Sequence, residues 1–270
     1  MSDFLDEMAS ASLSRARTLK ESTDPRRLET LSRLAPAPMQ VDFTAPGFDL
    51  IAEAKLASPS QGRLIEGSGK TVVSLARDFQ DRGAAIVSVL TEETRFAGSL
   101  HHLELTSAAL EIPVMRKDFL VDPAQVLEAR VSGASGLLLI ARLLPGGLLT
   151  EMTDLALGLG MFVLVEVFDR SDLETAVRVF DREVLVGVNC RDLATLEVDL
   201  GRFQSLAPHL PDHLPAVAES GLSSAADVAM VARLGYRLAL IGSSLVSADD
   251  PAANLAGLLS AGRQAWGVSA

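Results

Sequence analysis

From Asp49 onward the sequence alternates short, continuous apolar runs with longer segments of helical periodicity. Runs that are apolar at consecutive positions are typical of strands buried on both faces, and intervening helices make such strands parallel neighbours in one sheet. The runs are 50–54, 84–90, 113–116, 136–141, 161–167, 184–188, 216–219 and 238–241, with helices expected at 71–81, 124–131, 149–159, 171–180, 225–234 and 252–259. An open sheet of eight parallel strands would be larger than usual, so the sequence predicts an α/β fold, a closed (β/α)8 TIM barrel.

The first part of the chain has a different pattern. Apolar side chains recur at helical spacing over residues 2–20, at Leu5, Ala9, Leu13, Ala16 and Leu19. A second helix is expected at 25–34, because Pro25 suits a helix start and Pro36 follows the helix end. We therefore predict a helical N-terminal extension over residues 1–46 and a catalytic barrel domain over residues 47–270.

Acidic residues outnumber basic ones, 35 to 24, and the formal net charge is -11. This negative charge opposes binding to nucleic acid or to an anionic membrane surface. The single cysteine, Cys190, excludes an internal disulfide and a thiolate metal cluster. No apolar run is long enough to cross a bilayer, and the first residues lack the basic-then-apolar layout of a secretion signal. We expect a cytoplasmic protein with neither a nucleic-acid nor a membrane partner.

Charged and polar residues gather where the predicted strands end. Catalytic groups of such barrels lie at the carboxyl ends of the strands, and residues two apart on a strand share a face. We therefore expect Glu53 and Lys55 to point together into the mouth of the barrel. The other candidates at strand ends are Lys117, Glu166, Asn189 and Glu219.

Lysine is rare in this chain, with four lysines against twenty arginines, yet two of the four lie at the predicted mouth. A desolvated ammonium can lose and regain its proton near neutral pH, whereas a guanidinium cannot. This difference favours an acid–base role for Lys55 and Lys117. The alternative is that both lysines form structural ion pairs with Glu53 and Glu166. Pairing and proton transfer can also coexist.

Two glycine-bearing turns follow the last two predicted strands, one at Ser220-Gly221 and one at Gly242-Ser243. Small residues let backbone N–H groups approach phosphate oxygens, and a helix start adds partial positive charge. Barrels often bind phosphate with these two loops, so we predict a phosphorylated small molecule as substrate. None of the four histidines ends a predicted strand, and we expect no metal site.

Several segments in register with the predicted strands resemble the indole-3-glycerol-phosphate synthase family of tryptophan biosynthesis. They read IAEAK (51–55), SPS (58–60), FAGSL (96–100), PVMRKDF (113–119), LVEV (164–167), GVNCRDL (187–193), AESG (218–221) and IGSSL (241–245). The resemblance runs from about Pro25 to Val246. The residues that depart from the family pattern are Ala54, Leu56, Gln61, Phe168 and Cys190.

The resemblance implies closure of the indole ring, from 1-(2-carboxyphenylamino)-1-deoxyribulose 5-phosphate to indole-3-glycerol phosphate, with loss of carbon dioxide and water. It implies no cofactor. It assigns the general acid to Lys117, with Lys55 as the alternative or second acid. Glu166 and Glu53 are then the acid–base candidates for the later steps. The residues that would hold these groups and the substrate hydroxyls are Asn189 and Glu219.

The resemblance also implies how the substrate is bound, with the N-terminal extension capping the barrel beside it. The residues expected at the phosphate are Gly221, Gly242 and Ser243, aided by Lys55, and Ser220 is a further substrate-binding candidate. Ser58 and Arg191 would meet the other anionic or polar parts of the substrate. The apolar slot for the anthranilate ring would be formed by Phe96, Leu138 and Pro59. Core packing is the alternative role for Phe96 and Leu138.

Two other functions stay open at this point. One is another phosphosugar barrel enzyme of the phosphoribosylanthranilate isomerase type, which would be expected to pair a thiol with a carboxylate and would leave both lysines idle. The other is a catalytically silent paralogue that binds a sugar phosphate, which intact Lys117 and Glu166 disfavour. We expect a monomer, with other enzymes of the tryptophan pathway as the candidate protein partners.

Overall fold

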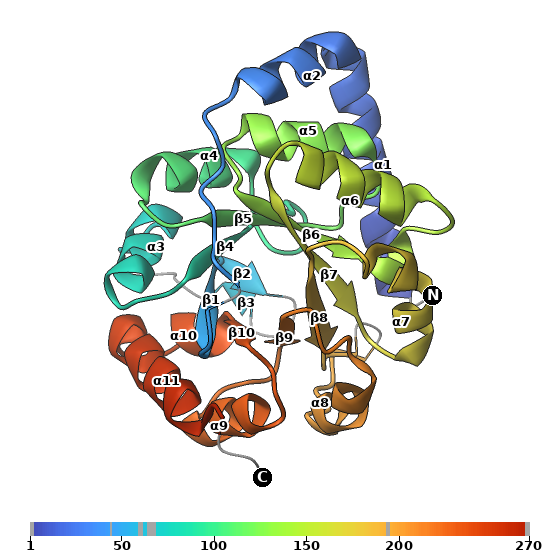
Figure 1. Cartoon of the computed structure of the whole chain (residues 1–270). Helices are drawn as coiled ribbons and strands as arrows, with labels where there is room; N and C mark the ends of the chain where they lie inside the picture. Colours follow the sequence, from blue (N-terminus) through green and yellow to red (C-terminus); the bar gives the residue numbers. More distant parts are fainter. Residues whose placement is uncertain (1–2, 44, 59–61, 64–68, 193–194, 268–270) are drawn as a thin grey trace.

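The computed structural model describes residues 3–43, 45–58, 62–63, 69–192 and 195–267. Eight strands close into a barrel in the order β1-β10-β9-β8-β7-β6-β5-β4, and every neighbouring pair is parallel (Figure 1). Helices surround the barrel between successive strands. The predicted (β/α)8 barrel is confirmed.

The barrel strands are β1 (Asp49–Ala54), β4 (Ile86–Leu90), β5 (Val114–Lys117), β6 (Gly136–Ile140), β7 (Phe162–Val167), β8 (Leu185–Asn189), β9 (Ala216–Glu219) and β10 (Leu238–Ile241). Each overlaps one predicted apolar run, with ends that differ by at most two residues. A short antiparallel hairpin, β2 (Ala57–Ser58) with β3 (Gly62–Arg63), follows β1.

The helices are α1 (Asp3–Ser22), α2 (Pro25–Leu34), α3 (Val72–Asp81), α4 (Leu100–Ala109), α5 (Pro123–Val131), α6 (Leu148–Gly158), α7 (Arg170–Ala176), α8 (Gly201–Leu206), α9 (Ala225–Arg233), α10 (Ser243–Val246) and α11 (Pro251–Ala265). Short 3-10 helices are η1 (Ala141–Leu143), η2 (Val177–Val179) and η3 (Ala207–His209). The helical periodicity did not predict α4, α8 or α10. Helices α8 and α10 are too short to show a period, and the apolar residues of α4 are not confined to one face.

Side chains at the helix starts fix where several barrel helices begin. Thr71, Asp122 and Ser224 each accept a hydrogen bond from a backbone N–H in the first turn of α3, α5 and α9. In all three helices the third residue returns a hydrogen bond to the cap, which completes a capping box. These reciprocal bonds satisfy backbone donors that a helix start otherwise leaves unpaired.

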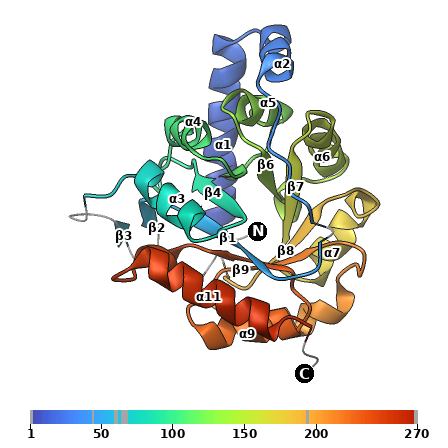
Figure 2. The same ribbon diagram turned by 60° about the vertical axis from the view of Figure 1, so that its left-hand side comes forward.

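Helices α1 and α2 lie outside the ring of barrel helices, against α5 (Figures 1 and 2). Asp24 caps α2 and Pro25 opens it, as the sequence predicts. Leu5 and Met8 of α1 are buried and belong to the same core as the barrel strands. The division of the chain at residue 46 stays a prediction, because one core includes residues from both sides of it.

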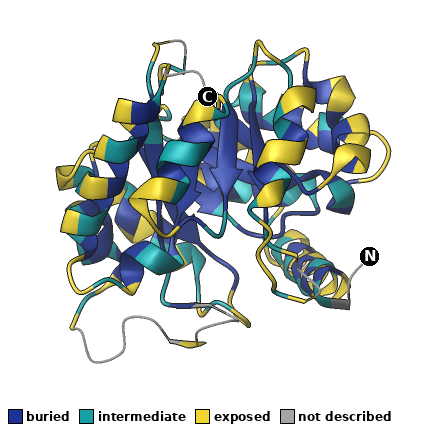
Figure 3. Ribbon diagram, turned by 90° about the horizontal axis from the view of Figure 1, so that it is seen from below, coloured by how far each residue is buried: buried dark blue, intermediate teal, exposed yellow. Residues whose placement is uncertain are grey.

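The core consists of the barrel strands and the inner faces of the helices that cover them. Figure 3 shows buried residues along the strands and exposed residues on the outer faces of the helices. All five residues of β4, β6 and β8 are buried, as expected for strands covered on both faces. Within the described residues, no helix is long and apolar enough to span a membrane.

Candidate active site

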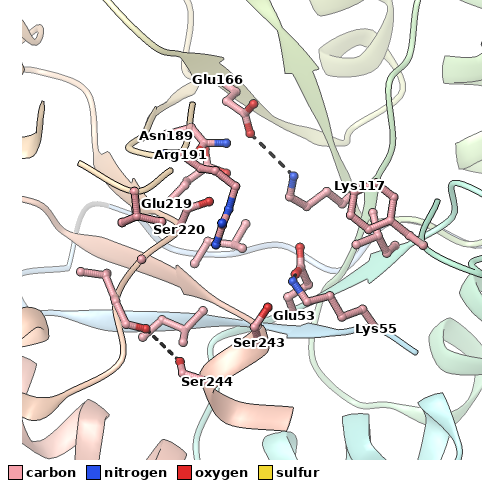
Figure 4. Close-up of a pocket in the computed structure, with 18 of the residues that line it drawn as sticks. Glu53, Lys55, Lys117, Glu166, Asn189, Arg191, Glu219, Ser220, Ser243 and Ser244 are labelled. Atoms are coloured by element: carbon pink, nitrogen blue, oxygen red, sulfur yellow. Dashed lines mark hydrogen bonds and ion pairs between the residues drawn. The ribbon is translucent and has the colours of Figure 1, made fainter. Parts of the chain in front are cut away.

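A cavity of about 340 Å³ opens at the carboxyl ends of the barrel strands. Figure 4 shows side chains from several strand ends converging on it. Its charged and polar lining includes Glu53, Lys55, Lys117, Glu166, Asn189, Arg191 and Glu219. The six residues that the sequence singles out for catalysis therefore meet around one cavity, although they are far apart along the chain.

Glu53 lies on β1 with its carboxyl group almost fully buried. Lys55 Nζ is 2.6 Å from Glu53 Oε1. Burial by itself would raise the pKa of Glu53, but the charges of Lys55 and Lys117 outweigh it and lower that pKa below its ordinary value. Glu53 is therefore a carboxylate at neutral pH. A Cβ at Gly242 would lie well under 3.0 Å from Glu53 Oε1, so this carboxylate fits beside a glycine.

Lys117 is the last residue of β5, and its Nζ is 3.7 Å from Glu166 Oε2 on β7 (Figure 4). Burial by itself would lower the pKa of Lys117, but the negative charges of Glu166 and Glu53 outweigh it and raise that pKa above its ordinary value. Both ion pairs of the structural alternative are thus present. Lys117 therefore stays an ammonium, although desolvation alone would shift it toward the neutral amine.

Glu219 has the opposite environment to Glu53. Burial and the negative charge of Glu166 raise the pKa of Glu219 well above its ordinary value, and the attraction of Lys117 offsets only part of this. Neither carboxyl oxygen of Glu219 has a hydrogen-bond partner among the described residues. The surroundings of Glu219 therefore favour its protonated form, whereas those of Glu53 favour the carboxylate.

Asn189 is the last residue of β8, and Arg191 lies two positions further along the chain. Asn189 Oδ1 accepts a hydrogen bond from the backbone N–H of Arg191 at 2.9 Å, and Arg191 Nη1 donates to Leu196 O at 2.9 Å. Both side chains line the cavity. These bonds fix the loop after β8, so that the amide and the guanidinium lie next to Glu219 (Figure 4).

All four predicted residues of the two glycine-bearing turns line the cavity. Ser220 and Gly221 have φ of 70° and 73°, a left-handed conformation that is uncommon for serine. Gly242 directly precedes α10, whose first residue is Ser243. Ser244 Oγ donates to Leu222 O at 2.8 Å, which ties the two turns together.

Three phenylalanine rings form an aromatic wall of the cavity. Phe119 has its ring 6.2 Å from that of Phe96 and 5.9 Å from that of Phe4 of α1, and all three line the cavity. Leu138 is fully buried and does not line the cavity, so core packing is the role that the structure gives it. Ile140, two residues further along β6, lines the cavity instead.

The chain around Lys117 is fixed by the hydrogen bonds of its neighbour Asp118. The Asp118 carboxylate accepts hydrogen bonds from Thr91 Oγ1 at 2.7 Å and from Arg116 Nη2 at 3.2 Å. Arg15 of α1 donates to the other oxygen at 2.7 Å. A fully bonded carboxylate beside the lysine holds the end of β5 in place. No sequence signal distinguishes it from a solvated aspartate.

Some predicted residues cannot be compared with the structure. Pro59 and Gln61 lie outside the described residues, and of Ser58 only the backbone, in β2, is described. Cys190 is buried, and its thiol donates to Ser220 O at 3.1 Å. Burial raises the pKa of Cys190 to about 12, so it is a packed thiol and not a nucleophile.

Metal ligands do not gather in the part of the chain that the structure describes. It contains no group of three or more histidine, cysteine, aspartate or glutamate side chains able to hold a metal ion. The charged groups of the cavity instead alternate in sign, with Lys55 on Glu53 and Lys117 on Glu166. Such an arrangement suits proton transfer between ammonium and carboxyl groups.

Fold and site together are those of a (β/α)8-barrel enzyme with an acid–base centre at the carboxyl end of the barrel. The family model described as indole-3-glycerol phosphate synthase matches residues 16–258. The chain is 44% identical over 237 residues to the indole-3-glycerol phosphate synthase of Mycobacterium avium, covering 87% of this chain and 86% of that protein. It is 42% identical, with the same coverage, to that of Mycobacterium tuberculosis. The chain therefore belongs to the indole-3-glycerol phosphate synthase family.

A solved structure of more distant sequence shares the fold. Thiamine phosphate pyrophosphorylase from Pyrococcus furiosus superposes with a TM-score of 0.59 at 14% sequence identity, over 82% of this chain and 98% of that chain. At this identity the likeness concerns the barrel alone.

Proposed function

We propose that the chain is a carbon–carbon lyase, a carboxy-lyase that converts 1-(2-carboxyphenylamino)-1-deoxyribulose 5-phosphate to indole-3-glycerol phosphate, carbon dioxide and water. The observation that carries this proposal is the 3.7 Å approach of Lys117 to Glu166 inside a cavity that also has an aromatic wall and two glycine-bearing turns. The reaction needs these elements together: an acid, a base, a ring slot and a phosphate anchor.

The first step forms the carbon–carbon bond. The ring carbon that bears the carboxylate attacks the substrate ketone, and negative charge develops on the carbonyl oxygen. Lys117 is the general acid of this step, because neighbouring carboxylates keep it protonated. It gives its proton to the developing alkoxide, which becomes a hydroxyl group. Lys55, paired with Glu53, is the second acid candidate.

Two losses then restore the aromatic ring. The carbon–carboxylate bond breaks and its electron pair returns to the positively charged ring system, which releases carbon dioxide without a cofactor. The new hydroxyl group leaves as water after protonation, and a base removes a proton from the substrate carbon bonded to the ring nitrogen, which completes the indole. Glu166 and Glu53 are the candidates for these proton transfers. Asn189 and Glu219 hold them and the substrate hydroxyls.

The substrate is oriented by the two turns and by the aromatic wall. Backbone N–H groups of the turns at Gly221 and Gly242 bind the phosphate, together with Ser220, Ser243 and Lys55. Phe96 and the aromatic residues beside it receive the anthranilate ring. Arg191 and Ser58 meet the remaining anionic and polar groups.

The environment of Cys190 argues against the isomerase alternative. A thiol with a pKa of about 12 that donates to a backbone carbonyl is a poor acid or base at neutral pH. The paired lysines, which an isomerase of that type would leave idle, are the main cations of the cavity. A monomer, a cytoplasmic location and contacts with other tryptophan-pathway enzymes stay predictions.

The test is direct incubation of the purified protein with the carboxyphenylamino deoxyribulose phosphate. We expect the fluorescence of the indole product to appear, together with one carbon dioxide per product. Absence of both between pH 6 and 9, with the phosphate compound still bound, would favour the silent sugar-phosphate binder.

A further inference from the structure

Glu219 lies against a glycine of the neighbouring strand. Gly187 is on β8, which pairs with β7 on one side and with β9 on the other. In this register Gly187 is opposite Glu166 of β7, and Asn189 is opposite Glu219 of β9. Residues two apart on a strand share a face, so Gly187 faces the same way as Asn189, between the two glutamates.

A side chain at position 187 would occupy the space that the Glu219 carboxyl takes. A Cβ built on Gly187 would lie well under 3.0 Å from Glu219 Oε1, and 3.0 Å from both Glu219 Cδ and Leu164 Cδ1. Real Cβ atoms essentially never come that close to another heavy atom. The Glu219 carboxyl therefore uses the room that the missing side chain leaves.

The backbone at Gly187 does not itself demand glycine. Gly187 lies inside a strand and is not among the glycines with positive φ. A glycine in a strand interior weakens the strand and often marks a place where another group approaches closely. Here that group is the carboxyl of Glu219.

We propose that Gly187 is a positioning residue for Glu219, and that its missing side chain lets the Glu219 carboxyl fold against β8 and approach Glu166. This inference rests on the proposed function and deepens it. Burial and the charge of Glu166 raise the pKa of Glu219, so the same placement favours its protonated form. A neutral carboxyl can donate a hydrogen bond to a substrate hydroxyl, whereas a carboxylate can only accept one.

Gly187→Ala tests the proposal. The clash falls on the far end of a flexible side chain, so we expect the variant to fold and its Glu219 carboxyl to move by about 1 Å or more. A displacement of that size predicts a fall in kcat of about 100-fold with little change in KM. The matched control is Gly158→Ala at the end of α6, where an added Cβ meets nothing within 4 Å and the rate should not change.

A double-mutant cycle separates positioning from general strain in the barrel. Glu219→Asp shortens the side chain by one methylene and removes the atom that clashes. We therefore expect Gly187→Ala to reduce kcat about 100-fold in the wild type but less than about threefold in the Glu219→Asp background. An equal factor in both backgrounds would overturn the proposal, since it would mean that the alanine acts on the barrel and not on Glu219.

A readout without substrate distinguishes this inference from the proposed function. Carboxyl ¹³C signals are titrated by NMR, with the Glu219 signal assigned from its loss in Glu219→Gln. We expect the pKa of Glu219 to fall toward its ordinary value in Gly187→Ala and to stay raised in Gly158→Ala. An unchanged Glu219 titration in Gly187→Ala refutes the positioning role, even if the wild type makes the indole product. A wild type that makes no indole product refutes the proposed function and leaves this titration as the test.

Discussion

Lys117→Ala removes the ammonium that lies 3.7 Å from Glu166 and leaves the phosphate turns untouched. If Lys117 is the general acid, kcat should fall by about 10²- to 10⁴-fold, the usual contribution of one positioned acid. KM should change little, because the lysine is not part of the phosphate anchor. Binding of the product, measured by calorimetry, should therefore survive in a variant that hardly turns over.

The same substitution changes the charge balance of the cavity. Lys117 is one of the cations that lower the pKa of Glu53, so this pKa should rise when the lysine is removed. Removing one partner of a buried ion pair costs about 3–5 kcal/mol if the remaining charge persists. Carboxyl groups with raised pKa take up protons at low pH, and the penalty is relieved there. The unfolding free energy of Lys117→Ala should therefore fall increasingly below that of the wild type as pH rises from 5 to 8.

Two further variants sharpen the result. Lys117→Arg keeps the charge but cannot give up a proton, so it should also lose most of its turnover. Lys20→Ala is the matched control: Lys20 also pairs with a carboxylate, Asp122, but at the surface, where such a pair is worth about 0–1 kcal/mol. Indole fluorescence gives the rates. Near-normal turnover in Lys117→Ala or Lys117→Arg would refute the role of Lys117 as the proton donor.

Three other outcomes are expected. Burial and the charge of Glu166 raise the pKa of Glu219 in the folded protein, so the wild type loses stability as pH rises from the unfolded-state pKa to the folded-state pKa. Glu219→Gln cannot ionise, so calorimetry should give it a higher melting temperature than the wild type at pH 8 and the same one near pH 4. A constant difference would contradict this. Phe119→Ala should lower the unfolding free energy by about 3 kcal/mol and raise KM, because a buried ring of the aromatic wall is lost; an unchanged KM would place the anthranilate ring elsewhere. Dialysis against a chelator should leave turnover unchanged, since the proposed steps use ammonium and carboxyl groups; strong inhibition would reveal a metal.

The barrel and the convergence of its charged residues could be predicted from the sequence for one physical reason. Strands buried on both faces are largely apolar, so a charged residue near the end of such a run needs a buried partner, as Arg116 has in Asp118, or a place at the open mouth of the barrel. All parallel strands end at the same rim, and Glu53, Lys117 and Glu166 therefore had to meet there. The order of apolar and charged residues along the chain is sufficient for this prediction.

Depth within the barrel could not be predicted in the same way. Leu138 and Ile140 share a face of β6, but only Ile140 reaches the cavity. Which of two inward-facing residues lies at the rim depends on the tilt and stagger of the strands. The local sequence pattern predicts neither the tilt nor the stagger. Phe4 was missed for a related reason. It is far from the barrel in sequence, and only the packing of α1 brings its ring to Phe119.

The glycines beside the glutamates show how one cavity shifts the pKa of two carboxyl groups in opposite directions. Glu53 lies against Gly242 with a lysine 2.6 Å away, whereas Glu219 lies against Gly187 with Glu166 as its charged neighbour. Each glycine leaves room on the barrel wall for a glutamate side chain, and the residues around that glutamate set the direction in which its pKa shifts. A glycine near the end of a buried parallel strand is therefore ambiguous in a sequence. It can mark a phosphate turn, or it can mark the place where an acidic side chain of the next strand lies.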